Sequence, residues 1–141
     1  ELDGTLPINV DGEPVKLQGR IDAYDPDKKQ IIELKSTKLF EDTKLPREKN
    51  VLQLQCYGTI FKKHVFDVNE LTLLYVDMDA FKTYSVPLVD KSLWLEGRVK
   101  TLHRAIRDSA PPTEEPSYNC QNCPYKTNCR AQKPVPLSSH S

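Results

Sequence analysis

The stretch GRIDAYDPDKKQIIELKST, Gly19–Thr37, joins two strand-like runs through a tight turn and carries acids on both of them. The turn at residues 25–28 has favourable turn chemistry, and the run KQIIELKST after it is rich in strand-forming residues. Side chains two apart on a strand share a face, so Glu33 and Lys35 project together. Antiparallel pairing through the turn brings Asp22, which we expect inside the preceding strand, alongside that face. The sequence therefore predicts two carboxylates and an ammonium on one face of a hairpin.

Two converging carboxylates repel each other, and a bound divalent cation relieves the repulsion. Mg²⁺ suits such a site because it accepts one or two carboxylates and keeps waters for a substrate phosphate. Lys35 beside the ion could position or deprotonate an attacking water. A solvated hairpin with a cross-strand Glu–Lys pair accounts for the same residues and stays an alternative. Asp25 and Asp27 are explained by the turn itself, so we expect Asp22 to be the ligand.

The composition indicates one soluble globular domain. The chain has 141 residues, of which 38% are apolar and 28% charged, which suits one modest core. No apolar run approaches the roughly 18 residues that span a bilayer, and no leader sequence is visible, so we expect a cytoplasmic protein. Basic and acidic residues balance, 20 against 20, so nucleic-acid contacts must depend on a local surface. The first residue is Glu1 rather than Met, and we expect a fragment or a processed chain.

The apolar pattern along the chain predicts a mixture of strands and helices. Asp11-Gly12 is a favoured hairpin turn pair. The expected elements are strands on each side of that turn, a strand over 29–37, a helix over 47–64, strands over 70–79 and 81–89, and a helix over 90–108. We expect Leu93, Leu95, Val99, Leu102 and Ile106 mostly on one side of the last helix. The predicted order is three strands, a helix, two strands and a helix, followed by a cysteine segment.

Gln53 and Tyr57 lie four apart on the first predicted helix and therefore share one of its faces. Such a pair is a weak signal alone, but it follows Gly-x-x-Asp and Glu-x-Lys in this order and on these elements. With this set the sequence resembles the PD-(D/E)XK nucleases, and within them the RecB-like exonucleases. The matching residues are Gly19 and Asp22, Glu33 and Lys35, and Gln53 and Tyr57.

The resemblance implies an α/β fold of the restriction-endonuclease type, with helices flanking a central mixed sheet. It also implies a metal-dependent exonuclease that hydrolyses single-stranded DNA or DNA ends, in CRISPR adaptation or recombinational repair and with the protein partners of those processes. The implied catalytic residues are Asp22, Glu33, Lys35, Gln53 and Tyr57, and the implied ligands of Mg²⁺ or Mn²⁺ are Asp22, Glu33 and the backbone carbonyl of Leu34. We expect this nuclease core over 1–110, a cysteine-rich segment over 111–133 and a disordered tail over 134–141.

The run CQNCPYKTNC carries Cys120, Cys123 and Cys129 in the spacing Cys-x₂-Cys-x₅-Cys. Three thiolates leave one vacancy in a four-thiolate centre, which suits structural zinc or an iron–sulfur cluster. The resemblance implies a [4Fe–4S] cluster. In RecB-like exonucleases of the CRISPR-associated type (the fourth Cas protein) and in the AddB nuclease subunit, three similarly spaced cysteines join one far upstream.

This sequence departs from that pattern because no cysteine precedes Asp22, and the family's N-terminal helices with their histidine are missing. Cys56 lies on the motif helix, where a buried thiol without a ligand role explains it. We therefore expect the fourth cluster ligand upstream of this chain, and the presence of the cluster in this chain stays open. The three histidines are expected to be poor metal ligands: His64, His103 and His140.

Local basic groups supply candidate phosphate contacts. They are Lys62, Lys63 and His64, the helical stripe Lys100, Arg104 and Arg107, and Lys126 with Arg130. A solvated helix face also explains such a stripe. Tyr118 and Tyr125 could stack on bases or cover the cysteines. Two other classes of function stay open beside the exonuclease: a non-catalytic DNA-end-binding module of a larger complex, and a zinc-stapled structural domain.

Overall fold

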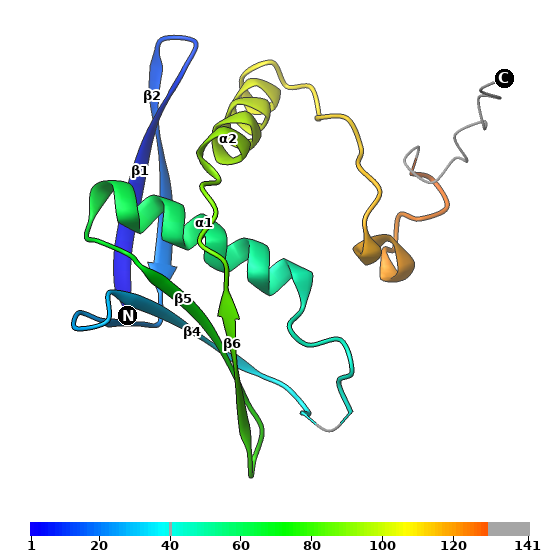
Figure 1. Ribbon diagram of the computed structural model, residues 1–141. Helices are drawn as coiled ribbons and strands as arrows, with labels where there is room; N and C mark the ends of the chain where they lie inside the picture. The colour runs from blue at the N-terminus through cyan, green and yellow to red at the C-terminus, as the bar shows by residue number, and fades with distance from the viewer. Residues whose placement is uncertain (40, 130–141) are drawn as a thin grey trace, which may run out of the picture. The chain divides into compact units, whose positions relative to one another are not determined.

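The computed structural model describes residues 1–39 and 41–129, with only the backbone of Tyr118. The chain divides into two compact units, Glu1–His103 and Arg104–Ser141. In chain order (Figure 1) the elements are β1 Leu2–Val10, β2 Glu13–Ile21, β3 Ala23–Asp25, β4 Gln30–Ser36, α1 Glu48–His64, β5 Glu70–Val76, β6 Phe81–Val86, α2 Ser92–Arg107 and the 3-10 helix η1 Tyr118–Asn122. The predicted tail over 134–141 lies outside the described residues, and the predicted domain boundaries stay predictions.

The first hairpin forms at the predicted turn. β1 and β2 pair antiparallel, and Asp11 and Gly12 have φ angles of 53° and 87°. Two positive φ values match the right-handed twist of paired strands, which is why such turns favour a glycine. Gly12 N–H donates to Asn9 Oδ1 over 2.9 Å and closes the turn.

The prediction that Asp22 lies inside a strand is wrong. Asp22 forms a bend between β2, which pairs with β1, and β3, the first strand of a four-stranded sheet ordered β3-β4-β5-β6. Four strands therefore precede α1, and not three. The bend allows Ile21 to be fully buried while the next side chain turns toward β4.

The four-stranded sheet is mixed, as predicted. β4 and β5 pair in parallel, and α1 connects them. β3 and β6 pair antiparallel with their neighbours. Leu54 and Phe61 of α1 are fully buried in one core with Leu71 and Leu73 of β5. The structure thus confirms the mixed α/β class, with α1 fixed on the sheet by apolar burial.

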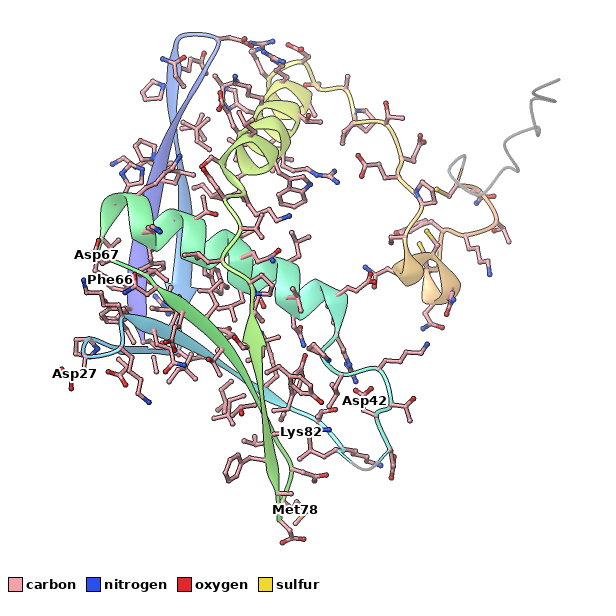
Figure 2. All side chains as sticks on the ribbon, viewed as in Figure 1. Asp27, Asp42, Phe66, Asp67, Met78 and Lys82 are labelled. Carbon is pink, nitrogen blue, oxygen red and sulfur yellow. The ribbon has the colours of Figure 1, made fainter. Side chains whose placement is uncertain are left out.

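Contacts after α1 anchor the turn between β3 and β4. The Tyr24 and Phe66 rings stack with centroids 3.7 Å apart, and the Tyr24 hydroxyl donates to the Asp67 carbonyl over 2.7 Å. Lys29 Nζ lies 3.1 Å from Asp67 Oδ2. Figure 2 shows Phe66 and Asp67 beside this turn, close to Asp27. These contacts fix the hairpin that carries the predicted acids.

Most of the apolar residues of α2 are exposed. Leu95 is buried and Val99 packs partly against the core. Leu93, Leu102 and Ile106 are 86%, 58% and 70% exposed. Leu95, Val99, Leu102 and Ile106 recur at intervals of three and four residues and therefore share one side of α2, whereas Leu93 lies off that side. Among the described residues of this side, only Leu95 and Val99 are covered by the core.

Candidate metal and catalytic site

Asp22 is held directly against β4. The antiparallel register pairs Ala23 with Ile32, so the preceding position faces Glu33. Asp22 Oδ2 accepts a hydrogen bond from the Leu34 backbone N–H over 2.8 Å. This contact fixes one carboxylate beside the strand that carries the other.

Asp25 serves the turn, as the sequence indicated. Its Oδ1 accepts hydrogen bonds from the backbone N–H groups of Asp27 and Lys28 over 3.0 and 3.2 Å. This is the local capping that turn aspartates make. Asp22 is therefore the acid of this hairpin that faces the candidate site.

Glu33 is a buried carboxylate with an unused oxygen. The residue is 5% exposed, and Lys35 Nζ lies 3.4 Å from its Oε1. Among the residues described, nothing forms a hydrogen bond with Oε2. Burial, and next the charge of Asp22, raise the pKa of Glu33, although Lys35 opposes both. A buried anionic oxygen without a partner is costly, and a cation at that oxygen would remove the cost.

A hydrogen-bonded chain leads from Glu33 to α1. Lys35 Nζ donates to Gln53 Oε1 over 2.8 Å, and Gln53 Nε2 donates to the Tyr57 hydroxyl over 3.0 Å. Burial, followed by the charge of Glu33, raises the pKa of Tyr57, so its hydroxyl stays neutral. The structure therefore brings together the two acids, the lysine and the Gln–Tyr pair that the sequence singled out.

Gly19 allows α1 to approach this closely. A Cβ atom at this position would lie 3.2 Å from the Tyr57 ring and 3.2 Å from Ile60. Such contacts are tighter than a packed core tolerates without movement. The glycine three residues before Asp22 is thus explained by the packing of Tyr57.

A second polar network, which the sequence analysis missed, fixes the start of α1. The buried Tyr75 hydroxyl accepts hydrogen bonds from the Arg47 N–H over 3.1 Å and from Asn50 Nδ2 over 2.7 Å. Asn50 is itself buried. Tyr75 pairs with Lys35 in the β4–β5 register. By tying the start of α1 to Tyr75, the network fixes the position of Gln53 along α1 relative to Lys35. The sequence did offer one signal for this network: Asn50 is a polar residue at a position where the helical pattern predicts burial.

The donor set fits a hard divalent cation. Asp22 and Glu33 offer carboxylate oxygens, and the backbone carbonyl of Leu34 belongs to the same strand. Mg²⁺ and Mn²⁺ accept oxygen ligands, and Mg²⁺ needs few from protein because it retains waters. Over residues 1–39 and 41–129, no three His, Cys, Asp or Glu side chains gather around a possible metal position. The candidate site therefore offers two acids, which is enough for Mg²⁺ because this ion keeps several waters. Two acids do not make a site in which protein groups supply all the ligands.

The cysteines are free thiols, each partly exposed. Cys120 lies in η1, and its Sγ accepts a hydrogen bond from Ser117 N–H over 3.3 Å. Cys123 ends η1. In the described part of the chain these two and Cys129 do not gather around a common centre. Burial raises the pKa of Cys56 despite the nearby Lys91, as expected for a thiol packed against the core.

Several of the remaining predicted groups have contacts of their own. His103 Nε2 lies 2.7 Å from Glu13 Oε2, and the basic stripe on α2 is paired, with Lys100 bound to Glu96 and Arg107 to Asp108. Tyr125 is exposed. Arg130 and His140 lie outside the described residues. None of the helices in the described ranges combines the length and apolarity that a bilayer crossing demands.

Comparisons with known proteins agree with this geometry. Residues 1–130 match the family model of the PD-(D/E)XK nuclease superfamily. The crystal structure of SSO0001 superposes with a TM-score of 0.61 at 26% sequence identity, over 94% of this chain. The match covers 60% of the SSO0001 chain. A search of curated proteins found no match.

The buried acid pair predicts a specific dependence of stability on pH. Because its pKa is raised on folding, ionised Glu33 destabilises the fold as pH rises above the unfolded glutamate pKa of about 4.3. In EDTA at pH 7, Glu33→Gln should therefore melt several degrees above the wild type. The difference should vanish near pH 3, more than one unit below the unfolded pKa, where the carboxyl is almost fully protonated in both states. Thermal melts over this range measure it.

Glu41→Gln is the matched control, since Glu41 is an exposed acid paired with Lys38. The melting temperature of this variant should stay within about a degree of the wild-type value, because exposed ion pairs contribute little to stability. A Glu33→Gln variant that melts below the wild type at pH 7 would contradict the electrostatic account.

Proposed function

The chain belongs to the PD-(D/E)XK nuclease superfamily, and from this membership we propose that it is a divalent-metal-dependent deoxyribonuclease. The proposed activity is that of an exonuclease, and the proposed substrate is single-stranded DNA or DNA ends. One observation carries the proposal: Glu33 Oε2 is buried and has no hydrogen-bond partner among the described residues. The charge of the nearby Asp22 carboxylate also raises the pKa of Glu33. A purely structural hairpin has no reason to keep that cost.

In the proposed reaction, Asp22, Glu33 and the Leu34 carbonyl hold Mg²⁺ or Mn²⁺. When bound, such an ion supplies a more acidic water and neutralises charge on the phosphate. Asp22 is oriented for this by the Leu34 N–H, which leaves its second oxygen for the ion. The burial of Glu33 keeps bulk water from screening the charges.

Lys35 is the proposed catalytic amine. In the described structure its ammonium donates to Glu33 Oε1 and Gln53 Oε1. An ammonium carries three donors, so one stays available for the attacking water or for a phosphate oxygen. Tyr57 accepts from the Gln53 amide and thereby turns the amide oxygen toward the lysine. Gln53 and Tyr57 are therefore proposed as positioning residues for Lys35.

We further propose that the chain is of the RecB-like, iron–sulfur type, with a role in CRISPR adaptation or recombinational repair. Support comes from the Cys-x₂-Cys-x₅-Cys spacing of Cys120, Cys123 and Cys129 and from the family resemblance. Their thiolates would supply three ligands of a [4Fe–4S] cluster.

Iron and acid-labile sulfide in anaerobically purified protein test the cluster assignment. Cys123→Ser should lose both, because it removes a ligand, whereas Cys56→Ser should keep them. Stoichiometric zinc without iron would support the zinc-stapled alternative instead.

Nuclease assays on end-labelled single-stranded DNA test the proposed reaction. Lys35→Ala and Glu33→Gln should each lower the Mn²⁺-dependent rate by about 10²–10⁴-fold, the usual contribution of a positioned acid–base group. Lys16→Ala, an exposed lysine of β2, should retain the wild-type rate. DNA that stays intact with wild-type protein and metal, despite measurable DNA binding, would favour the non-catalytic end-binding module.

A further inference from the structure

A cavity of about 430 Å³ lies between the second half of α1 and the connection from β6 to α2. Its lining residues are Gly58, Thr59, Lys62, Lys63, Leu88, Val89 and Asp90. All of them belong to the Glu1–His103 unit, and none belongs to the candidate catalytic site. The cavity has an apolar wall and two lysines at its edge.

The walls of this cavity are held in place. Gly58 leaves space, because a Cβ atom there would lie 3.1 Å from both Leu71 and Leu88. Thr59 Oγ1 donates to the Gln55 carbonyl over 3.0 Å and accepts from the Lys91 N–H over 2.9 Å. The connection to α2 is therefore tied to α1, and the cavity is a preformed feature of the fold.

Positive charge accumulates around the cavity, although the whole chain is balanced. The cavity edge and the first part of α2 carry five cationic residues against two acids: Lys62, Lys63, Lys91, Arg98 and Lys100 against Asp90 and Glu96. Lys63 Nζ lies 4.0 Å from Asp90, and Lys100 pairs with Glu96 over 2.6 Å. Within the ranges described, Lys62 Nζ has no hydrogen-bond or ion-pair partner. The cavity therefore retains uncompensated charge suited to an anion.

An exposed aromatic side chain, Trp94, lies on α2 together with Arg98 and Lys100. Trp94 is 42% exposed, and the Arg98 guanidinium lies 5.2 Å from its ring centroid. Leu95 N–H donates to the Lys91 carbonyl over 2.8 Å. This is a helical i to i−4 hydrogen bond, so Lys91 lies at the start of the first turn of α2. Trp94 follows Lys91 by about one turn. A tryptophan with a stacked guanidinium is a surface on which nucleic-acid bases stack.

We propose that Lys62, Lys63, Lys91, Trp94 and Arg98 form a binding surface for a single DNA strand, here called the lysine–tryptophan surface. The lysines contact backbone phosphates, and a base stacks on Trp94. The choice of DNA as the ligand rests on the proposed nuclease function. Lys62 and the catalytic-site residue Gln53 are nine residues apart on α1, which is about two and a half turns, or roughly 13.5 Å along the axis, and places them on opposite sides of the helix. The surface therefore anchors a strand away from the point of cleavage.

Trp94 is the chain's single tryptophan, so its fluorescence reports on this surface directly. Glu33→Gln protein in EDTA is titrated with oligothymidylate of about 12 nucleotides, while anisotropy of a labelled oligonucleotide records total binding. Fluorescence quenching should follow the anisotropy change. Adding Lys62→Ala and Lys63→Ala together should weaken binding on the order of tenfold at 0.1 M salt. It should also reduce the slope of log affinity against log salt by about 1.4, at roughly 0.7 per phosphate contact.

Lys16→Ala with Lys28→Ala is the matched control, because it removes two exposed lysines from β2 and from the β3–β4 turn. It should leave affinity and salt slope unchanged. Binding without quenching, or equal weakening in the control pair, would overturn the assignment. A poly-glutamate peptide that quenches Trp94 more strongly than the oligonucleotide would assign the surface to acidic proteins and also overturn it. If DNA quenches Trp94 fluorescence but the wild-type chain has no nuclease activity, the proposed function is wrong and the assignment of this surface still holds.

Discussion

The burial of the Glu33 carboxylate beside Asp22 is the constraint on which the site depends. Water would stabilise the Glu33 carboxylate better than the protein does, and Lys35 compensates only in part, since the pKa of Glu33 remains raised. Folding nevertheless brings the groups together because Leu54 and Phe61 bury α1 against the sheet. Apolar packing therefore supplies the free energy that holds an unfavourable acid pair in place. A site maintained at such a cost is typical of function and not of structural support.

The architecture converts that packing into geometry. The bend at Asp22 transfers the chain from the β1–β2 hairpin to the larger sheet, and at the same point it turns a carboxylate toward β4. The parallel β4–β5 pair requires a crossover, and α1 supplies it while presenting Gln53 to Lys35. Gly19 sets how closely the helix approaches. Each motif residue thus depends on one particular feature of the backbone.

Much of this could be predicted from sequence because local rules govern it. The Asp11-Gly12 turn follows from the preference of these residues for positive φ angles. The shared face of Glu33 and Lys35 and the i,i+4 pair Gln53–Tyr57 follow from backbone periodicity. The bend at Asp22 could not be predicted, because residues 19–25 look like one continuous strand in the sequence. The bend arises from tertiary pairing: β2 pairs with β1 in one sheet, and β3 pairs with β4 in another. The exposure of Leu102 and Ile106 could not be predicted either, because apolar spacing identifies one side of a helix but not how far along that side other elements cover it. The network around Tyr75 required the register of β4 and β5.

Binding of Mn²⁺ to the purified chain at pH 7, followed by isothermal titration calorimetry, tests the central claim most directly. The account predicts one ion per chain, with binding lost in both Glu33→Gln and Asp22→Asn and retained in Asp25→Asn, whose carboxylate serves a turn. Unchanged binding in the first two variants would show that these acids do not share a cation, and would contradict the account.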